Sequence, residues 1–267
     1  MRINTSEIKC LDVCAQLHHY LWIDCIKPVA PDSEALTLGK ATHSAIEARL
    51  LNKGIPTLAT FLPTPFECSP AKLEALELTL VEFDRRPHPW TEVIAVEQIV
   101  DRTLGTGDTI FGKIDLLARW QGRLWLVEHK TLGGYRSPTQ LANYVRTSLQ
   151  AGIYTWLAEK LEPIAGLMLN IVRKVSLKAA KESPSSALHV EFLTIGPDLV
   201  DHALLDVQDA ISRRRSAERP YRNRESCRNT FGNGMCGFYG VCWGRETLDS
   251  PAFTPYDPLA HYTEEAE

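Results

Sequence analysis

Hydrophobic positions in the first third of the chain recur with the spacing of amphipathic helices. An apolar stripe predicts a helix over residues 5–23. A second helix is expected over about 33–53, and a third begins at Ser69-Pro70 and ends before Pro87. The N-terminal part of the chain is therefore expected to be helical.

The middle of the chain has the composition of β-strands. Two runs rich in β-branched and aromatic residues flank Gln121-Gly122, and a short Gly-containing turn between such runs predicts a hairpin. The order of elements predicts a mixed α/β fold, with a central sheet flanked by helices. The expected strands are 91–103, 110–120, 123–129, 164–175 and 188–195, and the expected later helices are 138–161 and Pro197 to about 217.

Composition narrows the class of protein. Among 267 residues, 44% are hydrophobic and 23% are charged, which excludes a disordered or fibrous chain. The net charge of −4 excludes a strongly basic nucleic-acid coat protein, and no apolar run is long enough to cross a bilayer. We expect a cytoplasmic, intracellular protein without membrane contact, made of one domain over 1–245 and an acidic flexible tail over 246–267.

The predicted hairpin carries a concentration of charge. If Gln121-Gly122 is a two-residue turn, Asp115 lies directly opposite Glu128, with Cβ atoms roughly 5 Å apart. Strand alternation then places Lys130 on the same face as Glu128 and His129 on the other face. Two carboxylates and an amine are thus expected on one side of the sheet.

Two carboxylates so close repel each other, and a divalent cation relieves the repulsion. Oxygen ligands suit Mg²⁺ or Mn²⁺, and Lys130 can orient or deprotonate an attacking water. This chemistry is that of metal-assisted phosphodiester hydrolysis. The alternative is a surface charge cluster in which Lys130 only neutralises the acids.

Further polar residues lie within apolar patterns. Glu97 interrupts the run VEQIV, either as a site residue or on an exposed strand face. His43 lies in an apolar helix pattern, either as a metal ligand or as an ordinary boundary histidine. Gln150 and Tyr154 are i, i+4 neighbours on one helix face. They either support the site or are ordinary polar residues of a helix surface.

In this order, the motifs resemble the PD-(D/E)XK nuclease superfamily, specifically its RecB-like exonuclease branch. Gly39–His43 matches its G-x-x-x-H motif, and Gly112–Asp115 matches G-x-[IV]-D. Glu128–Lys130 matches [DE]-x-K, and Gln150–Tyr154 matches Q-x-x-x-Y. The resemblance covers about residues 5–245 and implies a restriction-endonuclease-like core. It also implies that the metal ligands are His43, Asp115, Glu128 and the backbone carbonyl of His129, that Lys130 is catalytic, and that Gln150 and Tyr154 support the site.

Seven cysteines cluster near the two ends of the chain, and their odd number disfavours a complete disulfide framework. They indicate either a metal centre that joins the ends or buried small side chains. The opening helix resembles that of RecB-like nucleases with an iron–sulfur cluster, among them the CRISPR-adaptation exonucleases. The resemblance implies a 4Fe–4S cluster, with structural Zn²⁺ as the alternative and Cys10 as a competing ligand. The implied ligands are Cys14, Cys227, Cys236 and Cys242.

Arginines are dense in the segment before the last cysteines, with a tyrosine among them. Arginine pairs well with phosphate and aromatic rings stack on unpaired bases, so this segment is a candidate DNA-binding surface. The alternative is a solvated helix face followed by a basic loop. The candidates are Arg213, Arg214, Arg215, Arg219, Tyr221 and Arg222.

Together these features predict a Mg²⁺- or Mn²⁺-dependent DNA exonuclease that acts on single-stranded or end-containing DNA in recombination, repair or phage DNA processing. No P-loop sequence is present, so unwinding would require a helicase or recombination protein as partner. The alternatives are a non-catalytic DNA-binding adaptor subunit with the same fold and an endonuclease of the restriction type.

Overall fold

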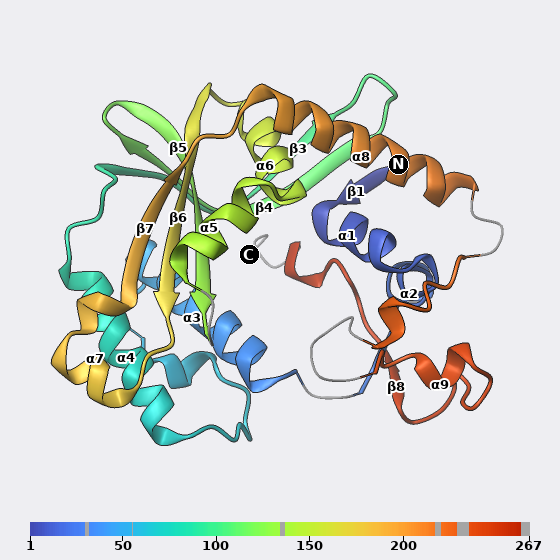
Figure 1. Cartoon of the computed structure of the whole chain (residues 1–267), viewed down its shortest axis with the longest axis horizontal. Helices are drawn as coiled ribbons and strands as arrows, with labels where there is room; N and C mark the ends of the chain where they lie inside the picture. Colours follow the sequence, from blue (N-terminus) through green and yellow to red (C-terminus); the bar gives the residue numbers. More distant parts are fainter. Residues whose placement is uncertain (30–31, 55, 134–136, 217–219, 229–234, 263–267) are drawn as a thin grey trace. The chain divides into compact units, whose positions relative to one another are not determined.

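The structure is a computed structural model (Figure 1). It divides into two compact units that are treated separately below. It describes all residues except 30–31, 55, 134–136, 217–219, 229–234 and 263–267. Unit 1 comprises 1–31, 101–111 and 204–267, and unit 2 comprises 32–100 and 112–203. The division between the two units lies inside residues 1–245, which the sequence analysis expected to form one domain.

A six-stranded mixed sheet forms the centre of the fold, as the sequence predicts. The strand order is β1-β4-β5-β6-β7, with β3 paired to β4. The β4–β5 and β6–β7 pairs are antiparallel, whereas β5–β6 and the short β1–β4 pair are parallel. The strands are β1 (Arg2–Asn4), β3 (Glu92–Thr103), β4 (Thr109–Trp120), β5 (Arg123–Leu132), β6 (Ile164–Arg173) and β7 (Leu188–Leu193).

The β4–β5 hairpin has the register that the sequence predicts. Gln121 and Gly122 both have positive φ, 51° and 73°, which is the geometry of a tight hairpin turn. Trp120 faces Arg123, and the pairing continues without a bulge to Leu116 and Val127. The next residues along the two strands are Asp115 and Glu128, so the turn determines how these acids are aligned.

Helices α3 (Glu34–Leu50) and α4 (Pro70–Arg85) pack on this sheet in unit 2. Ser33 caps α3 by accepting a hydrogen bond from the Leu36 backbone N–H, and Pro70 opens α4 at a position where proline suits a helix. The core joins the two helices to β4, β5 and β6. Its fully buried members include Leu38, Ile46, Leu80, Phe83, Leu116, Val127 and Met168.

Two of the expected long helices are interrupted. The expected helix over 138–161 is wrong as a single element, because Ser148 accepts a hydrogen bond from the Ala151 N–H and starts a new helix. It is therefore divided into α5 (Pro138–Arg146) and α6 (Leu149–Ala158). The expected helix over 5–23 breaks at Cys14, whose backbone is extended, and gives α1 (Thr5–Val13), α2 (Ala15–His18) and the π-helix η1 (His19–Ile23).

Unit 1 has a small core of its own. Tyr20 stacks on Phe238 with ring centroids 4.8 Å apart, and Phe238 stacks on Phe253 at 5.3 Å. Phe253 opens β8 (Phe253–Pro255), which pairs antiparallel with β2 (Ile26–Pro28). The expectation of a flexible tail from residue 246 therefore does not hold for these three residues, because a buried aromatic ring and a strand pairing fix them.

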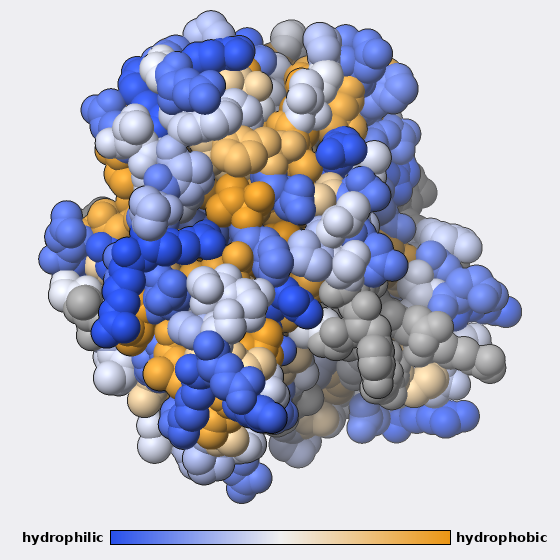
Figure 2. Space-filling model, turned by 60° about the vertical axis from the view of Figure 1, so that its left-hand side comes forward, coloured by the Kyte–Doolittle hydropathy of each residue, from blue (hydrophilic) through white to orange (hydrophobic). Residues whose placement is uncertain are grey.

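The remaining helices are α7 (Leu177–Glu182), α8 (Pro197–Ser216) and α9 (Tyr239–Cys242). Within the described residues, none of the helices combines the length and apolar content that a membrane span needs. Figure 2 shows one face of the surface, on which hydrophobic residues emerge in separate groups among hydrophilic ones. The individually exposed hydrophobic side chains include Tyr144, Phe192 and Leu205.

The close approach of β4 to α6 can be tested at Gly112. A Cβ atom there would lie 2.6 Å from Tyr154 Cε1, so we expect Gly112→Ala to lower the free energy of unfolding by about 1–3 kcal/mol. Urea unfolding followed by tryptophan fluorescence measures this change. Gly133→Ala is the matched control, because its Cβ would meet only Lys174 Cδ at an ordinary 3.5 Å. Equal losses in the two variants would contradict the packing.

Candidate active site

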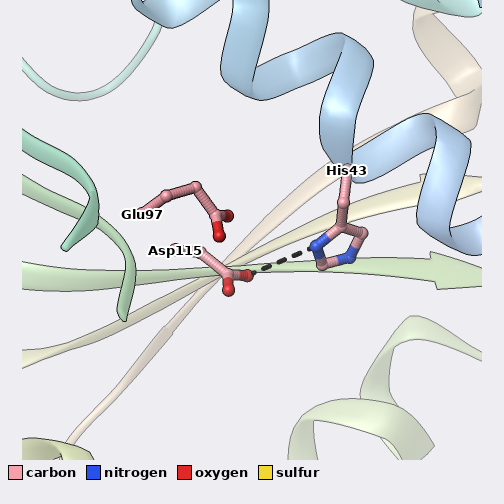
Figure 3. A group of neighbouring side chains, drawn as sticks. All are labelled: His43, Glu97 and Asp115. Atoms are coloured by element: carbon pink, nitrogen blue, oxygen red, sulfur yellow. Dashed lines mark ion pairs between the residues drawn. The ribbon is translucent and has the colours of Figure 1, made fainter. Parts of the chain in front are cut away.

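Three side chains from separate elements of unit 2 converge on one point. His43 comes from α3, Glu97 from β3 and Asp115 from β4 (Figure 3). One possible ligand atom from each lies within 4.8 Å of the other two, and His43 Nδ1 is 3.7 Å from Asp115 Oδ2. A histidine nitrogen with two carboxylate oxygens is a donor set that fits a divalent cation such as Mn²⁺ or Mg²⁺.

Glu97 is held in an uncommon backbone conformation. Its φ is +50° in the middle of β3, where a residue other than glycine rarely has positive φ. Such local strain is often found at functional sites, and a kink in a strand re-aims its side chains. Glu97 also forms an ion pair with Lys113 at 3.0 Å. The sequence indicated only a charge in an apolar run, and the fold brings that charge to Asp115.

Asp115 is placed by the neighbouring strand. Its Oδ2 accepts a hydrogen bond of 2.8 Å from the His129 backbone N–H. Burial, and next the charge of Glu128, raise the pKa of Asp115 well above its usual value, and Lys130 only partly opposes them. The site thus carries a carboxylate that is unfavourable as long as no cation compensates it.

Glu128 lies beside these residues, where a lysine and a glutamine hold its carboxylate. Its Oε1 accepts hydrogen bonds from Lys130 Nζ and from Gln150 Nε2, the latter at 2.9 Å. Among the described residues, Glu97 rather than Glu128 completes the close group with His43 and Asp115. In the structure Glu128 is therefore a buried acid whose carboxylate accepts hydrogen bonds from the Lys130 amine and the Gln150 amide.

Lys130 lies on the side of β5 that the strand alternation predicts. Burial alone would lower its pKa, but the carboxylates of Glu128 and Asp115 outweigh burial and raise the pKa of Lys130. Its amine is therefore a cation at neutral pH. Tyr144 on α5, which the sequence analysis did not identify, also raises the pKa of Lys130, and its side chain is exposed.

Tyr154 packs against the strand that carries Asp115. Its buried ring packs against Gly112, three residues before Asp115 on β4. Gln150, one turn earlier on α6, reaches Glu128. The two expected supporting residues thus contact the two strands that carry the acids.

His129 turns its ring away from the acids and into the protein. Asn170 Nδ2 lies 2.9 Å from His129 Nδ1, and Arg86 Nη2 donates to Asn170 Oδ1 at 3.1 Å. Because the arginine fixes the orientation of the amide, Asn170 donates and His129 Nδ1 accepts. Burial lowers the pKa of His129 well below its usual value, so the ring is neutral. Asn170 was missed in the sequence, where the only signal was one polar residue in an apolar strand.

The His43 ring is also neutral at physiological pH. Burial lowers its pKa, Lys130 adds to the effect, and Glu128 together with a hydrogen bond to the His129 backbone opposes it. A neutral imidazole is the form of histidine that binds metals. His43 is therefore in the protonation state that a ligand requires.

A separate group of thiols lies in unit 1. Cys14, Cys227, Cys236 and Cys242 line a common cavity with Tyr20, and Cys10 is not among the described lining residues. Burial raises the pKa of Cys236 and of Cys242, and neighbouring thiols contribute. The Asn223 N–H donates to Cys14 Sγ at 3.3 Å. The four cysteines implied by the family resemblance are therefore brought together.

The structure assigns partners within the chain to three arginines that were expected to bind DNA. Arg213 pairs with Asp12 and Asp209, Arg214 with the buried Glu7, and Arg215 with the buried Asp108. These arginines neutralise acids of unit 1, and their assignment to a phosphate track stays a prediction. Arg219 lies outside the described residues, whereas Tyr221 and Arg222 line an open groove.

The pKa of Asp115 gives a prediction for stability. A carboxyl with a raised folded-state pKa destabilises the folded state as pH rises above the unfolded value of about 4. We therefore expect Asp115→Asn to raise the Tm of EDTA-treated protein at pH 8 by about 2–4 °C, with the gain shrinking towards pH 4. Mn²⁺ should stabilise the wild type more than the variant.

Thermal unfolding monitored by circular dichroism measures both effects. Glu159→Gln, an exposed acid at the end of α6, is the matched control and should change neither the Tm in EDTA nor the response to Mn²⁺. A lower Tm for Asp115→Asn in EDTA at pH 8 would contradict the electrostatic description of the site.

Comparisons with solved structures and with curated proteins bear on the fold of the chain. The solved structure of a candidate exonuclease from Eubacterium rectale has a TM-score of 0.56 at 12% identity, covering 94% of this chain and 90% of that one, which indicates a shared fold. The structure of SSO0001 matches with a TM-score of 0.38 at 14% identity, covering 82% of this chain and 90% of that one, too weak a likeness to support a fold assignment. No curated protein matched the sequence significantly.

A scan against protein-family models gave the most direct result. The model of the PD-(D/E)XK nuclease superfamily matches residues 2–242, nearly the whole chain, and includes every residue of the site described above. The chain therefore belongs to the PD-(D/E)XK nuclease superfamily.

Proposed function

We propose that this protein is a divalent-metal-dependent DNA exonuclease. The observation that carries the proposal is the convergence of His43, Glu97 and Asp115 beside the ammonium group of Lys130. Nucleases of this superfamily use divalent metals, and the donor set fits such an ion. The function is thus assigned to the site in unit 2 rather than to the fold as a whole.

His43 and Asp115 are the proposed metal ligands, with Glu97 as an addition to the set expected from the sequence. Glu128 and the backbone carbonyl of His129 remain proposed ligands. A bound Mg²⁺ or Mn²⁺ would act as a Lewis acid on a phosphoryl oxygen of the substrate. Glu128 would join this set with the Oε1 atom that Gln150 now holds at 2.9 Å.

Lys130 acts as a cation in this proposal. Its amine donates to Glu128 and is kept protonated by the two acids. It therefore orients the attacking water and compensates the negative charge that develops on the phosphate, and it does not serve as a base in this state. Gln150 and Tyr154 fix the strands that carry these groups.

Single-stranded or end-containing DNA is the proposed substrate. The similar fold of the candidate exonuclease from Eubacterium rectale and the order of the RecB-like motifs support it. Recombination, repair or phage DNA processing is the proposed context, with a helicase or recombination protein as partner. The alternative is a DNA-binding adaptor that does not cleave.

Substitution of Lys130 distinguishes a DNA exonuclease from a DNA-binding adaptor that does not cleave. We expect Lys130→Ala to reduce Mn²⁺-dependent release of nucleotides from end-labelled single-stranded DNA by about 10²–10³-fold, because the charge that stabilises the transition state is lost. Lys178→Ala, at an exposed position on α7, is the control and should keep full activity.

Both variants should be assayed against linear and closed circular single-stranded DNA. Degradation of linear DNA alone supports an exonuclease, whereas cleavage of circles would indicate an endonuclease. Equal rates for wild type and Lys130→Ala would reject the enzyme and favour the adaptor.

A 4Fe–4S cluster held by Cys14, Cys227, Cys236 and Cys242 is proposed for unit 1, with structural Zn²⁺ as the alternative. Four thiols around one cavity suit either group, and thiolate coordination would offset the burial that raises the pKa of Cys236. The group would join the break between α1 and α2 to the segment around α9. Its role would be to restrain a long loop rather than to perform redox chemistry.

Anaerobic purification tests this cofactor. We expect the wild type to be brown, to absorb broadly near ~400 nm and to contain iron and sulfide. Cys14→Ser should lower the iron content and the yield of folded protein, because Cys14 lines the cavity. Cys68→Ser in unit 2 is the matched control and should change neither. Iron-free, zinc-loaded wild type would instead establish the zinc alternative.

A further inference from the structure

An open groove in unit 1 lies beside the thiol cavity and takes no part in the proposed chemistry. Its volume is about 870 Å³, and its lining includes Tyr221, Arg222, Arg224 and Trp243. The superfamily match over residues 2–242 assigns no role to this groove. Its lining combines two aromatic side chains, Tyr221 and Trp243, with two basic ones, Arg222 and Arg224.

The two aromatic rings are open to solvent. Tyr221 is 72% exposed and Trp243 is 45% exposed, so a large part of the apolar area that each ring offers to a ligand faces solvent. The Arg224 guanidinium lies over the Trp243 ring, 5.5 Å from its centroid. Planar π surfaces next to guanidinium groups are the features that bind unpaired bases and their phosphates.

The charges of the groove differ from those on α8. Arg213, Arg214 and Arg215 are paired with acids, whereas no carboxylate of the described residues forms an ion pair with Arg222 or Arg224. Glu225 also lines the groove, so the balance is two cations to one anion. The net positive charge of this lining favours the binding of a polyanion such as nucleic acid.

The wall of the groove is fixed before any ligand binds. The Gln16 N–H donates to the Tyr221 carbonyl at 3.0 Å, and Asn223 Nδ2 donates to the Val13 carbonyl at 2.9 Å. Asn223 also donates through its backbone N–H to Cys14 Sγ. These bonds tie residues 221–223 to the break between α1 and α2, so little conformational entropy remains to be lost on binding.

We propose that this groove binds single-stranded nucleic acid, with bases stacked on Tyr221 and Trp243 and phosphates on Arg222 and Arg224. Single strands are favoured over duplexes because a duplex hides the base faces that these rings would contact. This inference rests on the proposed function, from which it takes nucleic acid as the ligand. It adds a binding site that is distinct from the proposed metal site.

Binding of fluorescein-labelled dT20 tests the proposal. Fluorescence anisotropy should be measured with Ca²⁺ in place of Mn²⁺ and in a Lys130→Ala background, so that cleavage does not interfere. We expect Tyr221→Ala and Trp243→Ala each to weaken binding about 10-fold, the loss expected for one base–aromatic stack. Tyr221→Phe and Trp243→Phe, which keep a ring, should restore most of the affinity.

Leu205→Ala, which removes an exposed hydrophobic side chain from α8, is the control and should bind dT20 as the wild type does. Trp243 also lines the thiol cavity, so its variants need an iron or zinc measurement as well. Tyr221 does not belong to the described lining of that cavity, and its variants keep the test valid if Trp243→Ala fails to fold.

Two outcomes would overturn the proposal: unchanged dT20 binding by Tyr221→Ala, or equal losses for dT20 and for a blunt dT20·dA20 duplex. Hydrolysis of bis(p-nitrophenyl) phosphate by proteins with an intact Lys130 distinguishes the two proposals. If Tyr221→Ala binds dT20 normally while the wild type hydrolyses this small diester, only the groove assignment fails. If the wild type does not hydrolyse it but Tyr221→Ala loses dT20 binding, the groove stands and the nuclease assignment fails.

Discussion

The antiparallel register of β4 and β5 is the constraint on which the site depends. The turn at Gln121-Gly122 fixes that register, and it brings the His129 N–H to Asp115 Oδ2. A slip of one residue would send each of these side chains to the other face of the sheet. Asn170 and the buried ring of His129 then hold β5 from its opposite side. The acids are therefore aligned by backbone geometry before any ligand arrives.

The electrostatics of unit 2 show a site that is costly to build. Burial and mutual repulsion oppose the ionisation of Asp115, and the nearby Lys130 only partly compensates. Glu97 adds a third acid through a strained backbone. Three buried or partly buried acids and a strained backbone lower the stability of the folded state, but they create a site that can bind a cation. Functional sites often combine low local stability with activity in this way.

Unit 1 uses its charges for a different purpose. The arginines at the end of α8 neutralise Glu7, Asp12 and Asp108, and thereby bind segments that are far apart in the sequence. Glu7 also contacts His18 at 3.0 Å, so one buried acid joins three elements. The thiol cavity and the groove beside it are lined by other residues than those of this network. High arginine density here reflects both internal ion pairs and an exposed basic wall.

The sequence by itself determined the hairpin, its register, the strands on either side and the motifs that identify the superfamily. These features depend on local turn geometry and on alternation over a few residues, which neighbouring residues specify. Only the tertiary structure decided that Glu97 joins His43 and Asp115, that Asn170 fixes His129, and that Arg213–Arg215 are paired internally. It also broke the helix at Cys14, which helical periodicity did not indicate. Each of these outcomes depends on partners distant in the chain, and hydrophobic periodicity carries no information about which distant charge a side chain will meet.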